Sequence, residues 1–81
     1  MTVSLNVLYF ASLRERAGRD QETVASAAAD LAGLYEELSV RHDLHWPRAQ
    51  LRVAVDGVFA DWAQPLRSGT EVVFIPPVSG G

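Results

Sequence analysis

An apolar run near the C-terminus, residues 70–75, limits what this chain can fold into more than any other segment. Four consecutive apolar residues, 72–75, are typical of a central, covered strand. Pro76 and Pro77 follow directly and cannot donate backbone hydrogen bonds, so the strand must end before them. The fold must therefore bring strands from earlier in the chain to both sides of this last one.

Two strands and a helical turn are predicted before residue 26. Residues 3–9 alternate between apolar and more polar side chains, the period of two that indicates a strand with one buried face. Residues 10–19 break this alternation and include Gly18, which favours a short helical turn and a loop. We expect residues 21–25 to form a second strand, in a hairpin with the first.

One long helix is predicted in the middle of the chain. Its apolar residues follow the spacing i, i+3, i+4 and i+7, and Asp30 is the expected N-cap. Glu37 and Arg41 have the favourable i, i+4 spacing on the exposed side. The alanines before Asp30 could extend the helix toward its N-terminus, and Pro47 marks its latest end. The buried stripe consists of Leu31, Leu34, Tyr35 and Leu38.

A β-hairpin is predicted next. Residues 51–55 alternate in polarity, and the dipeptide Asp56-Gly57 that follows is typical of a type I′ turn. The returning strand is residues 58–60. A turn-rich stretch, residues 65–69, then leads to the last strand.

The element order is therefore strand, strand, helix, strand, short strand, strand. It predicts an α+β domain of residues 1–75, with a mixed sheet of four to five strands packed on one main helix. This is the β-grasp, or ubiquitin-like, arrangement, in which the first and last strands lie parallel at the centre of the sheet. A chain of 81 residues can build one such core, but not a core plus a buried active site.

The composition excludes several classes of function. The chain has no cysteine, which excludes disulfides, cysteine-ligated metals and a thiol nucleophile on this chain. All seven of its basic residues are arginines, spread along a chain of net charge −3, and this argues against nucleic acid as the main partner. Without lysine, no side-chain amine can accept another protein's C-terminus. We expect no signal peptide, no membrane span and a cytoplasmic location.

The main candidate for a functional segment is the extended tail, residues 76–81. Its two prolines stiffen the base, and its glycine tip is thin enough for a narrow channel. Terminal glycines bury nothing and lose more backbone entropy on ordering than other residues, so they do not serve the fold. The tail could reach about 20 Å beyond the sheet. A frayed terminus is the alternative interpretation. We expect the Gly81 carboxylate to be offered to a partner's active site, with these residues inserted into it: Pro76, Pro77, Val78, Ser79 and Gly80.

Three apolar side chains near the tail are candidates for a partner interface. If Phe59, Phe74 and Ile75 point away from the helix, they would dock a partner and aim the tail. All three could instead belong to the core. Trp62 presents the same choice, with the core favoured.

The remaining charged candidates are weaker. Arg14 lies in a loose basic cluster with Arg16 and Arg19, which could steer the chain onto an acidic partner or simply form a solvated face. His42 and His45 lack a third metal ligand nearby, so we expect no metal. A surface histidine near a helix C-terminus accounts better for His42.

Four motifs run through the chain: Phe-Ala-Ser-Leu-Arg-Glu (10–15), Val-Ala-Val-Asp-Gly (53–57), Pro-Leu-Arg-Ser-Gly-Thr-Glu-Val (65–72) and Phe-Ile-Pro-Pro-Val-Ser-Gly-Gly (74–81). Together they resemble the small subunit of molybdopterin synthase over the full length of the chain, and the last motif is the most specific. Asp56 stands where this family often has asparagine.

The resemblance implies a sulfur carrier with no catalytic groups and no bound cofactor of its own. A ubiquitin-activating-like adenylyltransferase would use ATP to convert Gly81 to an acyl-adenylate, and a sulfurtransferase system would turn this into a thiocarboxylate. The tail would then enter the large subunit, which would carry the catalytic groups. There the sulfur would pass to cyclic pyranopterin monophosphate to build the dithiolene of molybdopterin. A heterotetramer of two small and two large subunits is also implied.

Two other functions remain open on the sequence. The first is a sulfur carrier for another pathway, such as thiazole, cysteine or tRNA thiolation. The second is a ubiquitin-like modifier that forms an isopeptide bond between Gly81 and a target lysine. The identity of the partner protein would distinguish molybdopterin synthesis from another sulfur pathway. Covalent conjugates recovered from cells would indicate a protein modifier.

Overall fold

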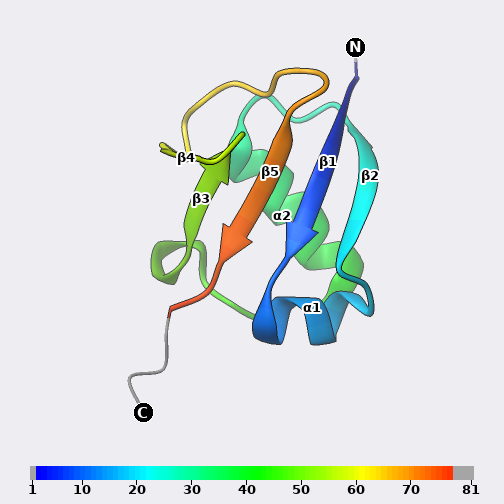
Figure 1. Cartoon of the computed structure of the whole chain (residues 1–81), viewed down its shortest axis with the longest axis vertical. Helices are drawn as coiled ribbons and strands as arrows, with labels where there is room; N and C mark the ends of the chain where they lie inside the picture. Colours follow the sequence, from blue (N-terminus) through cyan, green and yellow to red (C-terminus); the bar gives the residue numbers. More distant parts are fainter. Residues whose placement is uncertain (1, 78–81) are drawn as a thin grey trace.

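The computed structural model describes residues 2–77, in which one five-stranded sheet packs on one side against a long helix (Figure 1). The elements are β1 (Val3–Tyr9), α1 (Ala11–Ala17), β2 (Gln21–Ser26), α2 (Leu31–His42), the short 3-10 helix η1 (Arg48–Gln50), β3 (Arg52–Val55), β4 (Val58–Ala60) and β5 (Glu71–Ile75). The strand order is β2-β1-β5-β3-β4. The last strand, β5, lies in the middle as expected, parallel to β1 and antiparallel to β3.

Alternation along β1 and the apolar stripe of α2 build the core between sheet and helix. Leu5, Val7 and Tyr9 of β1 are buried, and so are all four residues of the predicted helical stripe. Burying side chains of this kind contributes about 1.5–3 kcal/mol each before chain entropy is counted. The predicted strands and the long helix are therefore confirmed, and hydrophobic burial is what holds them together.

The predicted N-cap of α2 is confirmed, but the helix does not extend into the alanines before it. The Asp30 side chain accepts a hydrogen bond from the Gly33 backbone N–H at 2.8 Å. The extension is wrong because β2 runs on to Ser26, whose hydroxyl accepts the Ala28 backbone N–H at 3.1 Å. At the other end α2 stops at His42, before Pro47. Asp43, the residue after His42, adopts a left-handed conformation that ends the helix.

The β3–β4 hairpin turns through Asp56 and Gly57, whose φ angles of 50° and 85° match the predicted type I′ turn. The Asp56 side chain also accepts the Glu71 backbone N–H at 2.9 Å, and the Asp56 N–H donates to the Glu71 carbonyl at 2.8 Å. These two bonds tie the turn to β5. The first of them requires a side-chain acceptor oxygen at this position, which asparagine also carries.

Phe74 lies in the core, so the hypothesis that it forms part of a partner interface is wrong. Its side chain is 0% exposed. The ring packs 5.2 Å from that of Tyr35 on α2 and stacks on Trp62 at 5.9 Å between ring centres. Successive residues of a strand point to opposite faces, so Phe74 faces α2 whereas Ile75 faces away. Trp62 is half-buried, which agrees with the prediction that it packs against the core.

A cluster of polar groups joins β1, β2 and the end of α2. The Tyr9 hydroxyl donates to Glu22 at 2.5 Å, and the His42 Nε2 lies 2.7 Å from the same carboxylate oxygen. The His42 side chain is only 14% exposed and packs edge-on against the Tyr9 ring. The prediction of a surface histidine is therefore wrong, because β2 brings an acidic partner to it.

These contacts lower the pKa of Glu22. Burial by itself raises the pKa of this carboxyl, but the hydrogen bonds from Tyr9 and His42, with the charges of His42 and Arg19, outweigh it. Because the pKa is lower in the folded chain than in the unfolded chain, the carboxylate stabilises the fold above its ordinary pKa of 4.5. That contribution is lost as the pH falls through the lowered value.

Glu22→Gln is expected to reduce the free energy of unfolding at pH 7 by about 1–3 kcal/mol, since the hydrogen bonds from Tyr9 and His42 then end on a neutral amide oxygen instead of a carboxylate. The loss should shrink as the pH falls below 4.5 and the wild-type carboxyl takes up a proton. Urea unfolding of both chains from pH 7 to pH 3 measures this. Parallel curves over the whole range would show that Glu22 does not act through its charge.

Candidate functional site

The face of the sheet away from α2 carries an apolar row across four strands. Strand register places Leu8, Val73, Ala54 and Phe59 side by side, each one the direct partner of the next. Val73 and Ala54 in the middle are almost buried, whereas Phe59 at the edge is 63% exposed. We call these four residues the outer-face row. An apolar row on an otherwise uncovered sheet face is typical of a protein-binding surface.

The tail begins at the end of this face. Ile75 is the last residue of β5 and points to the same side as Val73, two residues before it. Pro76 and Pro77 follow outside the strand, which confirms that they end it. Figure 1 shows the chain leaving the sheet beside α1, at the end where β1 and β5 both finish.

A groove of about 530 Å³ lies at the base of the tail. We call it the tail-base groove. Phe10, which is 47% exposed, and Trp46 line it together with the last residues before the tail. The Trp46 indole N–H donates to the Ser12 hydroxyl at 2.8 Å, and the Tyr35 hydroxyl donates to the Trp46 carbonyl at 2.7 Å. These bonds hold the loop after α2 against α1, so the groove has fixed walls.

Sequence reasoning missed Phe10 and Trp46. A signal for Phe10 was present, because Tyr9 is in phase with the buried face of β1 and the next residue must therefore point elsewhere. Trp46 gave no such signal, since it lies in a loop whose position depends on contacts with α1.

The three arginines of the predicted basic cluster, in and just after α1, do not form one free basic patch. Arg14 is exposed and lies 3.8 Å from Asp20, and Arg16 lies 4.0 Å from Asp43. Arg19 is 3.6 Å from Glu22. Each positive charge therefore already has its own carboxylate, and at the surface such pairs contribute little. Arg14 stays a candidate contact residue, because its backbone N–H donates to the carbonyl of Phe10, which lines the tail-base groove.

The predicted insertion segment lies mostly outside the described residues. Only Pro76 and Pro77 fall within them, and Val78, Ser79, Gly80 and Gly81 do not. Their roles, and the boundary between a domain of residues 1–75 and a tail of residues 76–81, stay predictions.

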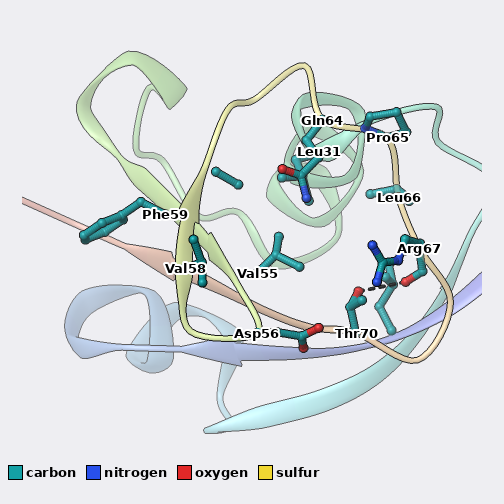
Figure 2. A pocket seen from close by; sticks show the side chains of 12 residues that line it. Leu31, Val55, Asp56, Val58, Phe59, Gln64, Pro65, Leu66, Arg67 and Thr70 are labelled. Carbon is teal, nitrogen blue, oxygen red and sulfur yellow. Dashed lines mark hydrogen bonds between the residues drawn. The ribbon is translucent and has the colours of Figure 1, made fainter.

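A separate small cavity of about 190 Å³ lies at the opposite end of the sheet (Figure 2). It opens between the β3–β4 hairpin and the loop that leads to β5, where Val55, Val58 and Leu31 line it. Figure 2 shows the Phe59 ring directed away from this cavity and the Thr70 hydroxyl bonded to the Arg67 carbonyl, at 2.7 Å. β5 starts at this end and the tail leaves from the other, so the cavity is not part of the tail site.

Neither a metal centre nor a membrane helix is found in residues 2–77. No three His, Cys, Asp or Glu side chains there are grouped closely enough to hold a metal ion. Within the same residues, no helix has both the length and the apolar character needed to cross a membrane.

The sheet order, the single long helix across one face and a tail that continues from the central strand define a ubiquitin-like β-grasp protein. Comparison with known proteins agrees. The family model described as "ThiS family" matches residues 7–81. The chain is 35% identical to the molybdopterin synthase sulfur carrier subunit of Escherichia coli, over 95% of this chain and 99% of that protein. The chain belongs to the ThiS family, and the resemblance to molybdopterin synthase small subunits is confirmed.

Solved structures show the same fold. SAMP1 from Haloferax volcanii superposes with a TM-score of 0.78 and 26% identity, covering 96% of this chain and 99% of SAMP1. A complex of subunits 1 and 2 of the molybdopterin-converting factor from Helicobacter pylori contains a chain with a TM-score of 0.65 and 25% identity. That match covers 98% of this chain and 100% of the other. Relatives of this chain are therefore small sulfur-carrier subunits that work beside a separate large subunit.

Proposed function

We propose that this chain is the sulfur carrier subunit of a molybdopterin synthase and that Gly81 carries the sulfur. The observation that carries the proposal is the position of the tail. It continues from the central strand, whose Phe74 is buried in the core. It starts at the tail-base groove, which is also lined by Ile75, on the same face of the sheet as the outer-face row. A partner that grips these surfaces can thus hold the start of the tail in a defined direction.

The chemistry starts from a poor electrophile, because a carboxylate has no good leaving group. A ubiquitin-activating-like adenylyltransferase joins the Gly81 carboxylate to AMP from ATP and releases pyrophosphate. The terminal sulfur of a persulfide on a sulfurtransferase then displaces AMP, which gives an acyl disulfide. A second thiol on the partner cleaves the S–S bond, and the thiocarboxylate stays on Gly81. Because these steps consume ATP, we place the chain in the cytoplasm.

Delivery uses the large subunit. The tail enters its active site, where the thiocarboxylate sulfur forms a C–S bond to the side chain of cyclic pyranopterin monophosphate and displaces an oxygen substituent from that carbon. The sulfur is then held in a thioester with Gly81. Water then restores the Gly81 carboxylate, and a second loaded carrier supplies the other sulfur of the dithiolene. The acids, bases and phosphate-binding groups belong to the large subunit, and this chain supplies the reactive atom and its position.

Intact-mass analysis tests the proposal. After incubation with ATP, a sulfide source and the activating enzyme, the chain should gain about 16 Da, confined to the C-terminal peptide, as oxygen is replaced by sulfur. Adding the large subunit and the pterin substrate should remove the gain. If the activating enzyme is shown to load another carrier but this chain gains no mass, sulfur loading is rejected. If the chain is loaded but keeps the sulfur in the presence of the large subunit and the pterin substrate, this pathway is rejected.

Phe59→Arg is expected to weaken binding to the large subunit by at least about tenfold, because it places a charge at the exposed end of the outer-face row. The free energy of unfolding should change by only about 0.5 kcal/mol, as is usual for exposed positions. Calorimetric titration and urea unfolding measure the two effects. The matched control is Val40→Arg, on the exposed side of α2 at 85% exposure. Equal affinities for the two variants would remove Phe59 from the interface.

A further inference from the structure

A second groove, of about 240 Å³, lies at the β3–β4 edge of the sheet. We call it the edge groove. Phe59 on β4 and Trp62 just after it line the groove, together with Leu51 and Val53. β4 is the outermost strand of the sheet, so in the described part of the chain no further strand covers this side. The groove thus combines an aromatic lining with an open strand edge.

An arginine guanidinium lies over each of the two aromatic rings. The guanidinium carbon of Arg52 lies 5.4 Å from the centre of the Phe59 ring, and that of Arg48 lies 5.9 Å from the centre of the Trp62 ring. Stacking on a ring holds a guanidinium in place and leaves the N–H donors at its edge available. Both arginines are therefore fixed beside the groove with donors to offer.

Neither charge is neutralised within residues 2–77. Of the five other arginines, all but Arg67 have a carboxylate oxygen within 4.0 Å in the described residues, and Arg67 lies at the far end of the sheet. No such pair includes Arg48 or Arg52 in these residues, although the chain as a whole is acidic. The edge groove is thus a local site of uncompensated positive charge.

The edge groove also lies beside the start of the tail. Arg52 is the direct register partner of Ile75, the last residue before Pro76. Phe59 belongs both to the edge groove and to the outer-face row. Figure 1 shows η1 and the start of β3 at the end of the molecule from which the tail departs. Anything that holds the tail at its base is within reach of this groove.

We propose that the edge groove binds an extended acidic segment of the protein that takes up the tail. An apolar side chain of that segment lies between Phe59 and Trp62, and its carboxylates pair with Arg48 and Arg52. Carboxylates match the planar donor fork of a guanidinium, whereas a wholly apolar partner would bury two charges without partners. An extended segment can in addition pair with the open edge of β4. That the partner is the large subunit rests on the proposed function, but the chemistry of the groove does not.

The first test needs no partner. The acetylated and amidated peptide EDLEVDE is titrated into the ¹⁵N-labelled chain, with the uncharged peptide QNLQVNQ as its control. Amide shifts at residues 51–53 and 59–62 with the acidic peptide alone support the proposal. They should disappear in an Arg48→Gln, Arg52→Gln double variant. No shifts at millimolar peptide, equal shifts with the uncharged peptide, or the same shifts with inorganic phosphate alone would overturn it.

The second test uses the large subunit. Arg52→Gln and Arg48→Gln are each expected to slow association by about three- to tenfold at low salt and to weaken its salt dependence. The matched control is Arg67→Gln, which removes the same charge at the far end of the sheet and should associate like wild type. If Arg67→Gln slows association as much, the effect comes from the net charge of the chain and not from the edge groove. That result would overturn the assignment of the segment to the large subunit.

The two tests separate the possible failures. If the wild-type chain does not bind the large subunit but the acidic peptide binds the edge groove, the proposed function fails and the groove chemistry stands. If the large subunit binds normally and neither test responds to Arg48 or Arg52, the function stands and the inference is wrong.

Discussion

Deletion of Gly81 is expected to abolish sulfur loading and transfer while the free energy of unfolding stays the same. The truncated chain still ends in a glycine carboxylate, at Gly80, but its reacting atom lies about 3.5 Å short of the partner's catalytic groups. Misplacing a reacting group by only about 1 Å can cost a factor of about 100 in rate. Mass analysis after loading and the rate of dithiolene formation measure the loss, and urea unfolding measures the fold.

Two further variants separate the length of the tail from its shape. Gly80→Trp keeps the length but is expected to fail as fully as the deletion, because the tip no longer passes through a narrow channel. Val40→Trp, which adds the same bulk on the exposed side of α2, is the control and should be loaded like wild type. Full sulfur transfer by the Gly81-deleted chain would contradict the carrier hypothesis. Loading of Gly80→Trp at the wild-type rate would show that the partner's channel is open and that thinness is not the reason for the glycines.

The second large effect is expected in the core. Phe74→Ala should reduce the free energy of unfolding by about 3–5 kcal/mol, because it leaves a cavity between Tyr35 and Trp62. For a domain of this size that is a large part of the total, which is typically about 5–15 kcal/mol. Urea unfolding, followed by far-UV circular dichroism, measures the change.

Phe59→Ala is the matched control, since it removes the same side chain from an exposed position fifteen residues earlier in the chain. It should cost less than about 1 kcal/mol. Similar losses for the two variants would contradict the division of aromatic residues between core and surface. Bound partner is expected to stabilise the wild type in proportion to its affinity, so both chains must be measured alone.

Much of the fold could be predicted because its signals are local. The alternation of residues 3–9, the helical stripe from Leu31 to Leu38 and the Asp56-Gly57 turn each depend on residues only a few positions apart. The parallel pairing of β1 with β5 followed from the apolar last strand and the rule for crossover connections. The wrong helix extension came from alanine's high helix propensity, which is overridden because β2 ends only at Ser26 and the helix is capped at Asp30.

The direction of the aromatic side chains could not be predicted in this way. Residues 72–75 are all apolar, so the run does not show which of them face α2. Pairing of β5 with β1 and β3 decides which side chains face α2. It buries Phe74 against α2 and turns Ile75 to the opposite face of the sheet. His42 was misjudged for the same reason, since its partner Glu22 lies on β2, twenty residues away.

By itself, the sequence determined the order of the elements and the β-grasp fold, and it predicted a functional tail of residues 76–81. The order and the fold depend on periodicity and turn residues, which are local. Only the tertiary structure decided which surfaces lie near the start of that tail, at Pro76 and Pro77. The outer-face row, the tail-base groove and the edge groove combine residues from distant parts of the chain, so they exist only after strand pairing and helix packing have brought those residues together.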